Sequence, residues 1–139
     1  MTTSTAGIHH LGLTVPNVAQ TSAFFVEALG FKIVAQKPDY PAVFVSDGVI
    51  LLTLWQAQSE APTTFDRKSN VGLHHFALRL ADGHDLQAMY QTLSARSDVE
   101  IEFAPEALGA SPTKHLMCTI PGGLRMEIIA PVSEQAPSK

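Results

Sequence analysis

The stretches GIHHLGLTV (Gly7 to Val15) and GLHHFALRL (Gly72 to Leu80) each place two adjacent histidines before a run of alternating apolar residues. Four of the six histidines in the chain lie in these two pairs, and the second pair follows the first by 65 positions. Alternation with a period of two is typical of a strand that buries one face. The chain is therefore predicted to contain two copies of one motif, each opening with such a strand.

The elements predicted after each opening strand follow one order. In the first copy, Asn17 and Gly30 bound a segment whose apolar residues recur at helical spacing, and Asp47-Gly48 is a hairpin signal between two later strands. In the second copy, the polar segment ADGHD precedes a helical pattern, with Asp82 or His84 as its predicted N-cap, and three more strands follow. Residues 56–70 lack periodicity and are predicted to connect the copies.

This order predicts the α+β fold class. Two βαβββ modules, at about 7–55 and 71–131, form curved mixed sheets around a shared metal-binding cavity within one domain of 139 residues.

Composition and charge exclude several classes of function. Nine Lys and Arg against thirteen Asp and Glu give a net charge of −4 without any basic cluster, so no nucleic-acid or membrane partner is expected. Cys118 is the single cysteine, which excludes an internal disulfide, and the chain has neither a signal-like start nor an apolar run long enough to span a bilayer. A cytoplasmic protein is expected.

Strand alternation selects three candidate metal ligands. His10 and His75 are predicted to face the hollow between the modules, whereas His9 and His74 begin the apolar, helix-packing faces. Glu127, on the last strand, is flanked by Met126 and Ile128 and is costly to bury without a cation or a donor. Two imidazoles and one carboxylate suit Fe, Mn, Ni, Zn or Co and leave coordination positions open for substrate.

The sequence resembles the vicinal oxygen chelate superfamily, which includes glyoxalase I, type I extradiol dioxygenases, fosfomycin-resistance proteins and bleomycin-binding proteins. The resemblance rests on IHHLGLTVPNV with FFVEALGF, on LHHFALRLAD and on IPGGLRMEII, and it covers nearly the whole chain. The metal positions of the superfamily fall on His10, His75 and Glu127. The resemblance further implies a small-molecule substrate and a homodimer, with the modules paired either within one chain or across two.

Departures from the superfamily leave the reaction open. Glyoxalase I places a second metal-binding glutamate where this sequence has Leu51, and extradiol enzymes place a tyrosine where it has Met117. His115 is the predicted acid or base in place of that glutamate. The predicted substrate pocket comprises six residues: Leu51, Thr53, Trp55, Arg79, Met117 and Arg125.

These observations predict a small enzyme dependent on one divalent metal ion. It acts on a small molecule chelated through adjacent oxygens, by lyase, isomerase or dioxygenase chemistry. The alternative is a metal-free small-molecule-binding protein of the bleomycin-resistance type, which uses the same hollow without chemistry.

Overall fold

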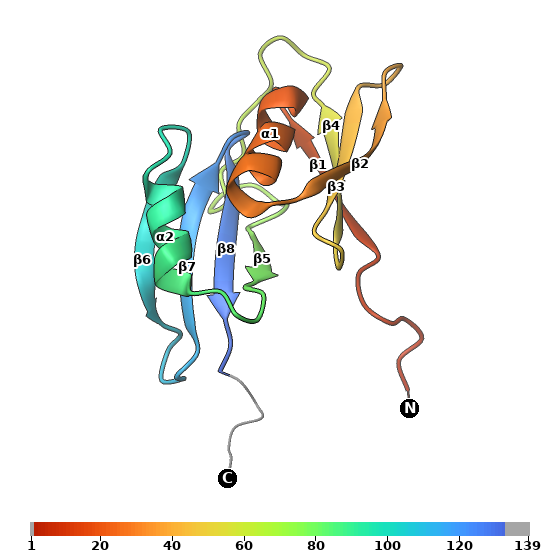
Figure 1. Ribbon diagram of the computed structural model, residues 1–139. Coiled ribbons are helices and arrows are strands. Elements are labelled where there is room, and N and C mark those ends of the chain that lie inside the picture. Colours follow the sequence, from red (N-terminus) through yellow and green to blue (C-terminus); the bar gives the residue numbers. More distant parts are fainter. Residues whose placement is uncertain (1, 133–139) are drawn as a thin grey trace. The chain divides into compact units, whose positions relative to one another are not determined.

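The computed structural model describes residues 2–132 and divides the chain into two compact units, Met1–Thr63 and Thr64–Lys139 (Figure 1). The division falls inside the segment 56–70 that the sequence predicts as a connector. Within residues 2–132, each unit has one helix and one four-stranded mixed sheet. The predicted α+β class with two βαβββ modules is confirmed.

The first unit contains one helix and four strands in the predicted order. They are β1 (His10–Val15), α1 (Val18–Leu29), β2 (Lys32–Lys37), β3 (Ala42–Ser46) and β4 (Leu51–Gln56). The strands lie in the order β1-β4-β3-β2, in which β1 and β4 are parallel and the other pairs are antiparallel. The parallel pair is possible because α1 carries the chain away from β1.

Helix α1 begins and ends at the two residues that the sequence predicts. The Asn17 side chain accepts a hydrogen bond from the backbone N–H of Gln20 at 3.0 Å. Gly30 adopts a left-handed conformation with φ of 75°, which lets its N–H cap the last carbonyl groups of the helix. Between these ends, Phe24 and Phe25 are fully buried against the sheet.

One face of the sheet in the first unit packs against α1. The opposite face, away from the helix, is called the open face in each unit. The helix-covered face carries the apolar core, namely Leu13, Val15, Val43, Val45, Leu52 and Leu54. Side chains alternate along each strand, so His10 and Gly12 lie on the opposite, open face of β1. Thr53 and Trp55 lie on the open face of β4 for the same reason.

The second unit repeats this plan. Its elements are β5 (Phe76–Arg79), α2 (Leu86–Ser94), β6 (Glu100–Ala107), β7 (Lys114–Ile120) and β8 (Leu124–Ala130). The strand order is β5-β8-β7-β6, again with one parallel pair, β5 and β8. Asp85 caps α2 by accepting from the N–H of Ala88, so the predicted caps at Asp82 and His84 are wrong by three residues and by one. A turn closed by the hydrogen bond from His84 N–H to the Ala81 carbonyl comes first, and Asp85 follows it in an extended conformation.

The core of the second unit lies between α2 and its sheet. Buried side chains on that side are Phe76, Leu86, Leu93, Leu116, Cys118, Met126 and Ile128. The open face of the sheet therefore carries Glu127 on β8 and His115 on β7, by alternation with Ile128 and Leu116. Within residues 2–132, no helix has the length and apolar character needed to cross a membrane.

Candidate metal centre

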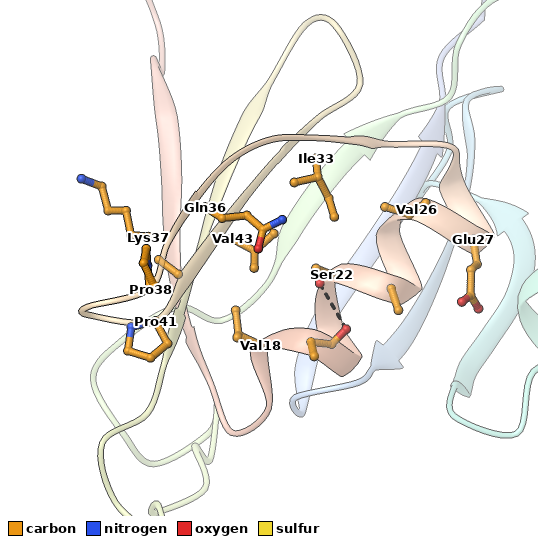
Figure 2. Close-up of a pocket in the computed structure, with 13 residues that line it drawn as sticks. Val18, Ser22, Val26, Glu27, Ile33, Gln36, Lys37, Pro38, Pro41 and Val43 are labelled. Carbon is orange, nitrogen blue, oxygen red and sulfur yellow. Dashed lines mark hydrogen bonds between the residues drawn. The ribbon is translucent and has the colours of Figure 1, made fainter.

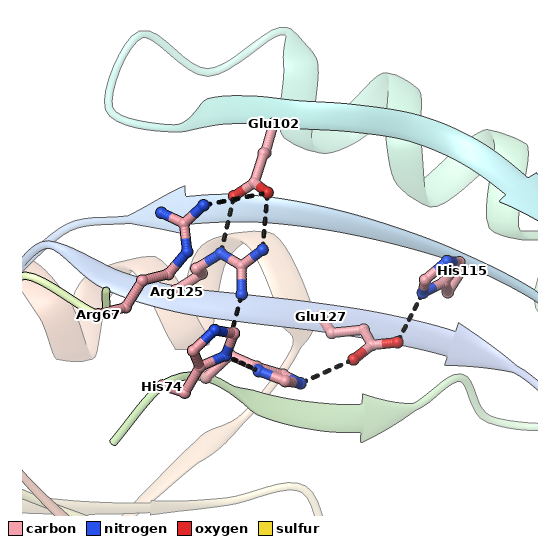
Figure 3. Close-up of polar contacts among 7 residues, drawn as sticks. Arg67, His74, Glu102, His115, Arg125 and Glu127 are labelled. Carbon is pink, nitrogen blue, oxygen red and sulfur yellow. Dashed lines mark hydrogen bonds and ion pairs between the residues drawn. The ribbon is translucent and has the colours of Figure 1, made fainter. Parts of the chain in front are cut away.

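Glu127 is a buried carboxylate on the open face of the second sheet. Glu127 is only 7% exposed, and its neighbours along β8, Met126 and Ile128, are apolar. One carboxylate oxygen, Oε1, lies 3.1 Å from His75 Nε2, and the other, Oε2, lies 2.7 Å from His115 Nδ1 (Figure 3). The two imidazoles thus provide the polar partners that a buried carboxylate requires.

A chain of polar contacts continues from His75 across the same sheet. His75 Nδ1 lies 2.7 Å from His74 Nδ1, which in turn lies 3.3 Å from an Arg125 guanidinium nitrogen. Arg125 donates two hydrogen bonds to the Glu102 carboxylate, at 2.7 and 2.6 Å, and Arg67 lies 3.8 Å from the same carboxylate (Figure 3). The contacts thus connect Glu102 on β6 with Arg125 on β8, and Arg125 with the histidine pair in the segment before β5.

Three members of this cluster have shifted pKa values. The hydrogen bonds from Arg125 hold the pKa of Glu102 below its ordinary value, and Glu102 in turn raises the pKa of Arg125. Desolvation, followed by the charge of Arg125, lowers the pKa of His74. The Glu102–Arg125 pair is therefore ionised at neutral pH, whereas His74 favours the neutral imidazole.

The structure brings together two of the three predicted metal ligands, His75 and Glu127. The third, His10, belongs to the first unit, where it is exposed and its Nδ1 lies 2.9 Å from His9 Nδ1. Among residues 2–132, no three His, Cys, Asp or Glu side chains are grouped so as to hold a metal ion. A complete ligand set that includes His10 stays a prediction.

Comparing the registers of the two sheets shows where the first unit differs from the second. On the parallel strands of the second unit, Ala77 pairs with Glu127. Gly12 precedes Ala77 by 65 positions, the repeat distance, and pairs with Thr53. Within the repeat, Thr53 is thus the counterpart of Glu127. Leu51, where the resemblance places the second glutamate of glyoxalase I, is the counterpart of Arg125.

Thr53 is bound within the first unit. It is 4% exposed, and its hydroxyl oxygen accepts a hydrogen bond of 2.9 Å from the indole N–H of Trp55. Trp55 also contacts Tyr40 and Phe44, with ring centroids 4.9 and 5.7 Å apart. This open face of β3 and β4 therefore presents an aromatic surface without a titratable group at the position of Glu127.

The six predicted pocket residues divide equally between the units. Leu51, Thr53 and Trp55 share the open face of β4 in the first unit. In the second unit, Met117 pairs directly with Glu127. Arg125 is two positions before Glu127, and Arg79 pairs with Ile129, two positions after it, so both arginines share the face of Glu127. A single pocket containing all six stays a prediction.

A separate pocket lies on the helix side of the first unit, between α1 and the β2–β3 hairpin (Figure 2). It has a volume of about 700 Å³ and is mainly apolar, with Val18, Val26 and Ile33 among its lining residues. Its ionisable lining residues are Glu27 and Lys37. None of the predicted site residues lines it, so it is not the expected metal centre.

Three contributors to the polar cluster were not predicted from the sequence. His74 was expected on the helix-packing face, but it contacts both His75 and Arg125. Glu102 and Arg67 were not singled out at all, although Glu102 accepts two hydrogen bonds from Arg125 and lies 3.8 Å from Arg67. The doubling of the histidine in both copies was the available signal for His74. His115, the partner of Glu127, was predicted as an acid or base, and this role stays a prediction.

Comparison with known proteins identifies the family of the chain. A model of the Glyoxalase/Bleomycin resistance protein/Dioxygenase superfamily matches residues 7–128, which cover most of both units and include every predicted site residue. The chain belongs to this superfamily. The resemblance to the vicinal oxygen chelate superfamily predicted from the histidine pairs is thereby confirmed. None of the curated proteins matches the sequence.

Solved structures of this superfamily share the fold. A glyoxylase/bleomycin resistance protein/dioxygenase domain from Frankia sp. EAN1pec has a TM-score of 0.78 and 18% identity, over 92% of this chain and 99% of that one. Lactoylglutathione lyase from Agrobacterium tumefaciens has a TM-score of 0.69 and 18% identity, over 92% and 96% of the two chains. The fosfomycin resistance protein FosX from Listeria monocytogenes has a TM-score of 0.69 and 14% identity, over 94% and 97%. At these identities the likeness concerns the fold alone.

Proposed function

We propose that this superfamily member is an enzyme that depends on one divalent metal ion and acts on a small molecule chelated through adjacent oxygens. His75 and Glu127 supply two ligands from the second unit, and His10 supplies the third from the first. The ion is Fe, Mn, Ni, Zn or Co, the metals that accept two imidazoles and one carboxylate.

The observation that carries this proposal is the surroundings of Glu127. A carboxylate that is 7% exposed on an apolar strand needs a cation or donors, and it has an imidazole nitrogen at each oxygen. His75 Nε2, 3.1 Å from Oε1, is an atom through which imidazoles bind metals. The donor atoms thus fit a divalent ion, and the half-buried His75 leaves the side away from the sheet open to a substrate.

The side chains around these ligands have distinct tasks. His115 donates to Oε2 of Glu127 and so fixes the orientation of the carboxylate that offers Oε1 to the ion. Met117 pairs directly with Glu127 on the neighbouring strand, so an apolar side chain stands beside the carboxylate on the same face of the sheet. When bound, the ion supplies Lewis-acid stabilisation of negative charge on the substrate oxygens.

The first unit limits the reaction. Thr53 stands at the counterpart of Glu127, and its hydroxyl is already bound to Trp55, so this position supplies neither a fourth ligand nor a base. The chemistry of glyoxalase I uses a second glutamate, which the resemblance places at Leu51. Neither Leu51 nor Thr53 carries a carboxylate, so this chemistry is disfavoured unless another group moves the proton. Lyase, isomerase and dioxygenase reactions on a chelated substrate remain the classes to test.

Metal content tests this proposal directly. Protein purified without a chelating tag is expected to hold about one equivalent of a transition metal per complete site, and Glu127→Gln and His75→Ala are expected to lose it. His84→Ala is the matched control, because this histidine is exposed and its Nδ1 lies 3.5 Å from the backbone carbonyl oxygen of Asp82. Absence of metal from all these proteins, even after anaerobic reconstitution, would leave the metal-free binding protein of the bleomycin-resistance type.

We also propose a homodimer, and one experiment decides whether its sites lie within or between copies. The variants His10→Ala and His75→Ala are each expected to lack metal. If sites form between copies, a mixed dimer of the two variants holds one intact ligand set and regains about half of the metal. If sites form within one chain, the mixed dimer holds none. Sedimentation analysis of the same samples checks the dimer itself.

A further inference from the structure

We infer that Arg79 binds an anionic group of the substrate, whose adjacent oxygens at the other end are chelated by the metal ion. This inference rests on the proposed function, because it names the substrate class of the same site. That class is a small chelating molecule with a carboxylate, phosphate or phosphonate group. Arg79 is thereby given a role in specificity.

Three residues at alternate positions, His75, Ala77 and Arg79, share the open face of the second sheet. His75 Nε2 lies 3.1 Å from the carboxylate of Glu127, and Ala77 pairs with Glu127 in the parallel ladder. Arg79 follows Ala77 by two residues, so strand alternation places it on the same face. A proposed metal ligand and a cation therefore lie on one side of this strand, with one small side chain between them.

The surface between His75 and Arg79 is open to a ligand. Ala77 and Arg79 are exposed, whereas Phe76 and Leu78, on the other face, are buried and half-buried. Residues four apart in an extended strand have Cα atoms about 13 Å apart, and the flexible arginine side chain shortens the gap that a ligand must span. A small molecule chelated beside His75 can thus lie over Ala77 and reach Arg79.

Arg79 is not neutralised by the strand beside it. It pairs with Ile129 on β8, an apolar residue, so the register places no carboxylate directly opposite it. The diagonal neighbour is Glu127, whose two oxygens already face the imidazoles of His75 and His115. Within residues 2–132, the Arg79 side chain forms no hydrogen bond or ion pair.

The other arginines near this face are engaged. Arg125 donates two hydrogen bonds to the Glu102 carboxylate, and Arg67 lies 3.8 Å from the same carboxylate. Arg79 instead leaves its N–H donors to a ligand. A guanidinium group has five donors and no acceptor, in a planar fork that fits two oxygens of one carboxylate or phosphate. Its complement is therefore an anion.

The first unit shows that strand pairing does not require this cation. Thr14 precedes Arg79 by 65 positions, the repeat distance, and pairs with Trp55 in the parallel ladder of β1 and β4. The same ladder thus forms with an uncharged residue at this position. The arginine of the second unit consequently has a task other than holding the sheet together.

Paired hydroxamates test the inference, because all of them chelate a metal through the same adjacent oxygens. The monohydroxamates of succinic, glutaric and adipic acids end in a carboxylate at increasing distance. Butyro-, valero- and hexanohydroxamate end in a methyl group at the matching positions. Calorimetry and the absorption spectrum of Co²⁺-loaded protein measure the binding of each probe, and phosphonates in place of the carboxylates show which anion gains more from Arg79.

The variants are Arg79→Gln, which removes the charge, and Arg79→Lys, which keeps the charge without the planar fork. Lys114→Gln is the matched control, because it removes the same charge from an exposed residue of the same sheet. Lys114 precedes His115, so alternation places it on the opposite face.

We expect at least one carboxylate probe to bind wild type and Lys114→Gln about 5-fold or more tightly than its methyl counterpart, the effect of one charge-assisted pair. In Arg79→Gln this preference should disappear while the affinity for the methyl probes stays unchanged. Arg79→Lys should retain part of it. The inference is overturned if wild type shows no preference at any chain length, or if Arg79→Gln keeps the preference.

The failure of the proposed function gives a different result. If wild-type protein binds no Co²⁺, Zn²⁺ or Fe²⁺, or binds metal but no hydroxamate, the metal proposal fails. Anion binding is then measured without metal, from the NMR signal of the Arg79 Nε–H during titration with glutarate. Arg96 is the internal reference, because Asp98 already engages its donors. A saturable shift of the Arg79 signal alone would support the anion site, and its absence would refute it.

Discussion

His115 Nδ1 lies 2.7 Å from Oε2 of Glu127, and both residues are at least nine-tenths buried on the open face of the second sheet. His115 is thus a partner of the proposed metal ligand rather than an isolated histidine. Its ring also packs against Phe103, with centroids 4.9 Å apart, which restricts its rotation. The carboxylate orientation therefore depends on a side chain that is itself fixed.

The substitution His115→Ala is expected to weaken metal binding by about 10- to 100-fold, the usual effect of losing an outer hydrogen bond to a ligand. It should also lower the free energy of unfolding by about 1–3 kcal/mol, because Oε2 of the buried Glu127 loses its donor. Calorimetric titration with Zn²⁺ and urea unfolding measure the two effects. In His115→Gln, an amide N–H can still donate, so partial recovery of both is expected. Unchanged zinc affinity in His115→Ala would refute the role.

The Glu102–Arg125 pair is expected to contribute stability in a pH-dependent way. Arg125 lowers the folded-state pKa of Glu102 from the ordinary value of 4.5, so the contribution is complete above that value and is lost as the pH falls through the lowered pKa. Glu102→Gln should therefore cost up to about 1 kcal/mol at neutral pH and much less in strong acid, since the pair is partly exposed.

Urea unfolding of Glu102→Gln and wild type over a series of pH values from neutral into strong acid tests this expectation. Glu100→Gln is the matched control, because Glu100 is an exposed glutamate on the same strand. An equal difference between wild type and Glu102→Gln at every pH value of the series would show that ionisation of Glu102 contributes nothing.

The sequence predicts those parts of the site that lie within regular strands. Glu127 is the middle residue of β8 and His115 is the second residue of β7, so both lie within regular strands and on the face that alternation assigns. His74 does not lie on the face that alternation assigns. It precedes β5, which begins at Phe76, so the alternation of a regular strand does not apply to it. Glu102 contacts Arg125 where the pairing of β6 with β7 shifts register between Ile101 and Phe103.

The position of Thr53 could not be predicted for a different reason. The repeat distance relates β1 to β5, but the loops between the strands of the two copies differ in length, so it cannot be extended to β4 and β8. Only the observed pairing of Gly12 with Thr53, and of Ala77 with Glu127, equates these two residues. Strand register follows from packing and turn geometry, which a composition pattern does not contain.

Cys118 is expected to be unreactive in the folded protein. The residue is fully buried in the core of the second unit, and this burial raises the pKa of its thiol to about 12. Because the thiolate is the reactive form, a disulfide reagent at neutral pH should modify Cys118 slowly in native protein and rapidly in urea. Rapid modification of the native protein would mean that the core around β7 opens readily.

The hydrogen bond from Trp55 to Thr53 offers a direct view of the first unit. Trp55 is the only tryptophan in the chain, so its fluorescence reports this face of β4 alone. Thr53→Val keeps the shape of the side chain but removes the acceptor 2.9 Å from the indole N–H, and it is expected to shift the emission and to cost about 1 kcal/mol of stability. Thr92→Val, at an exposed position of α2, is the control.

The same fluorescence also tests whether the aromatic surface of the first unit belongs to the substrate pocket. If a chelating ligand binds beside Trp55, its addition to metal-loaded protein should change the emission of wild type, and Glu127→Gln should abolish the change by removing the metal. A response that persists in Glu127→Gln would instead assign the ligand to a metal-independent surface, the behaviour expected of a binding protein. No response in either, with ligand binding measured independently by calorimetry, would exclude Trp55 from the pocket.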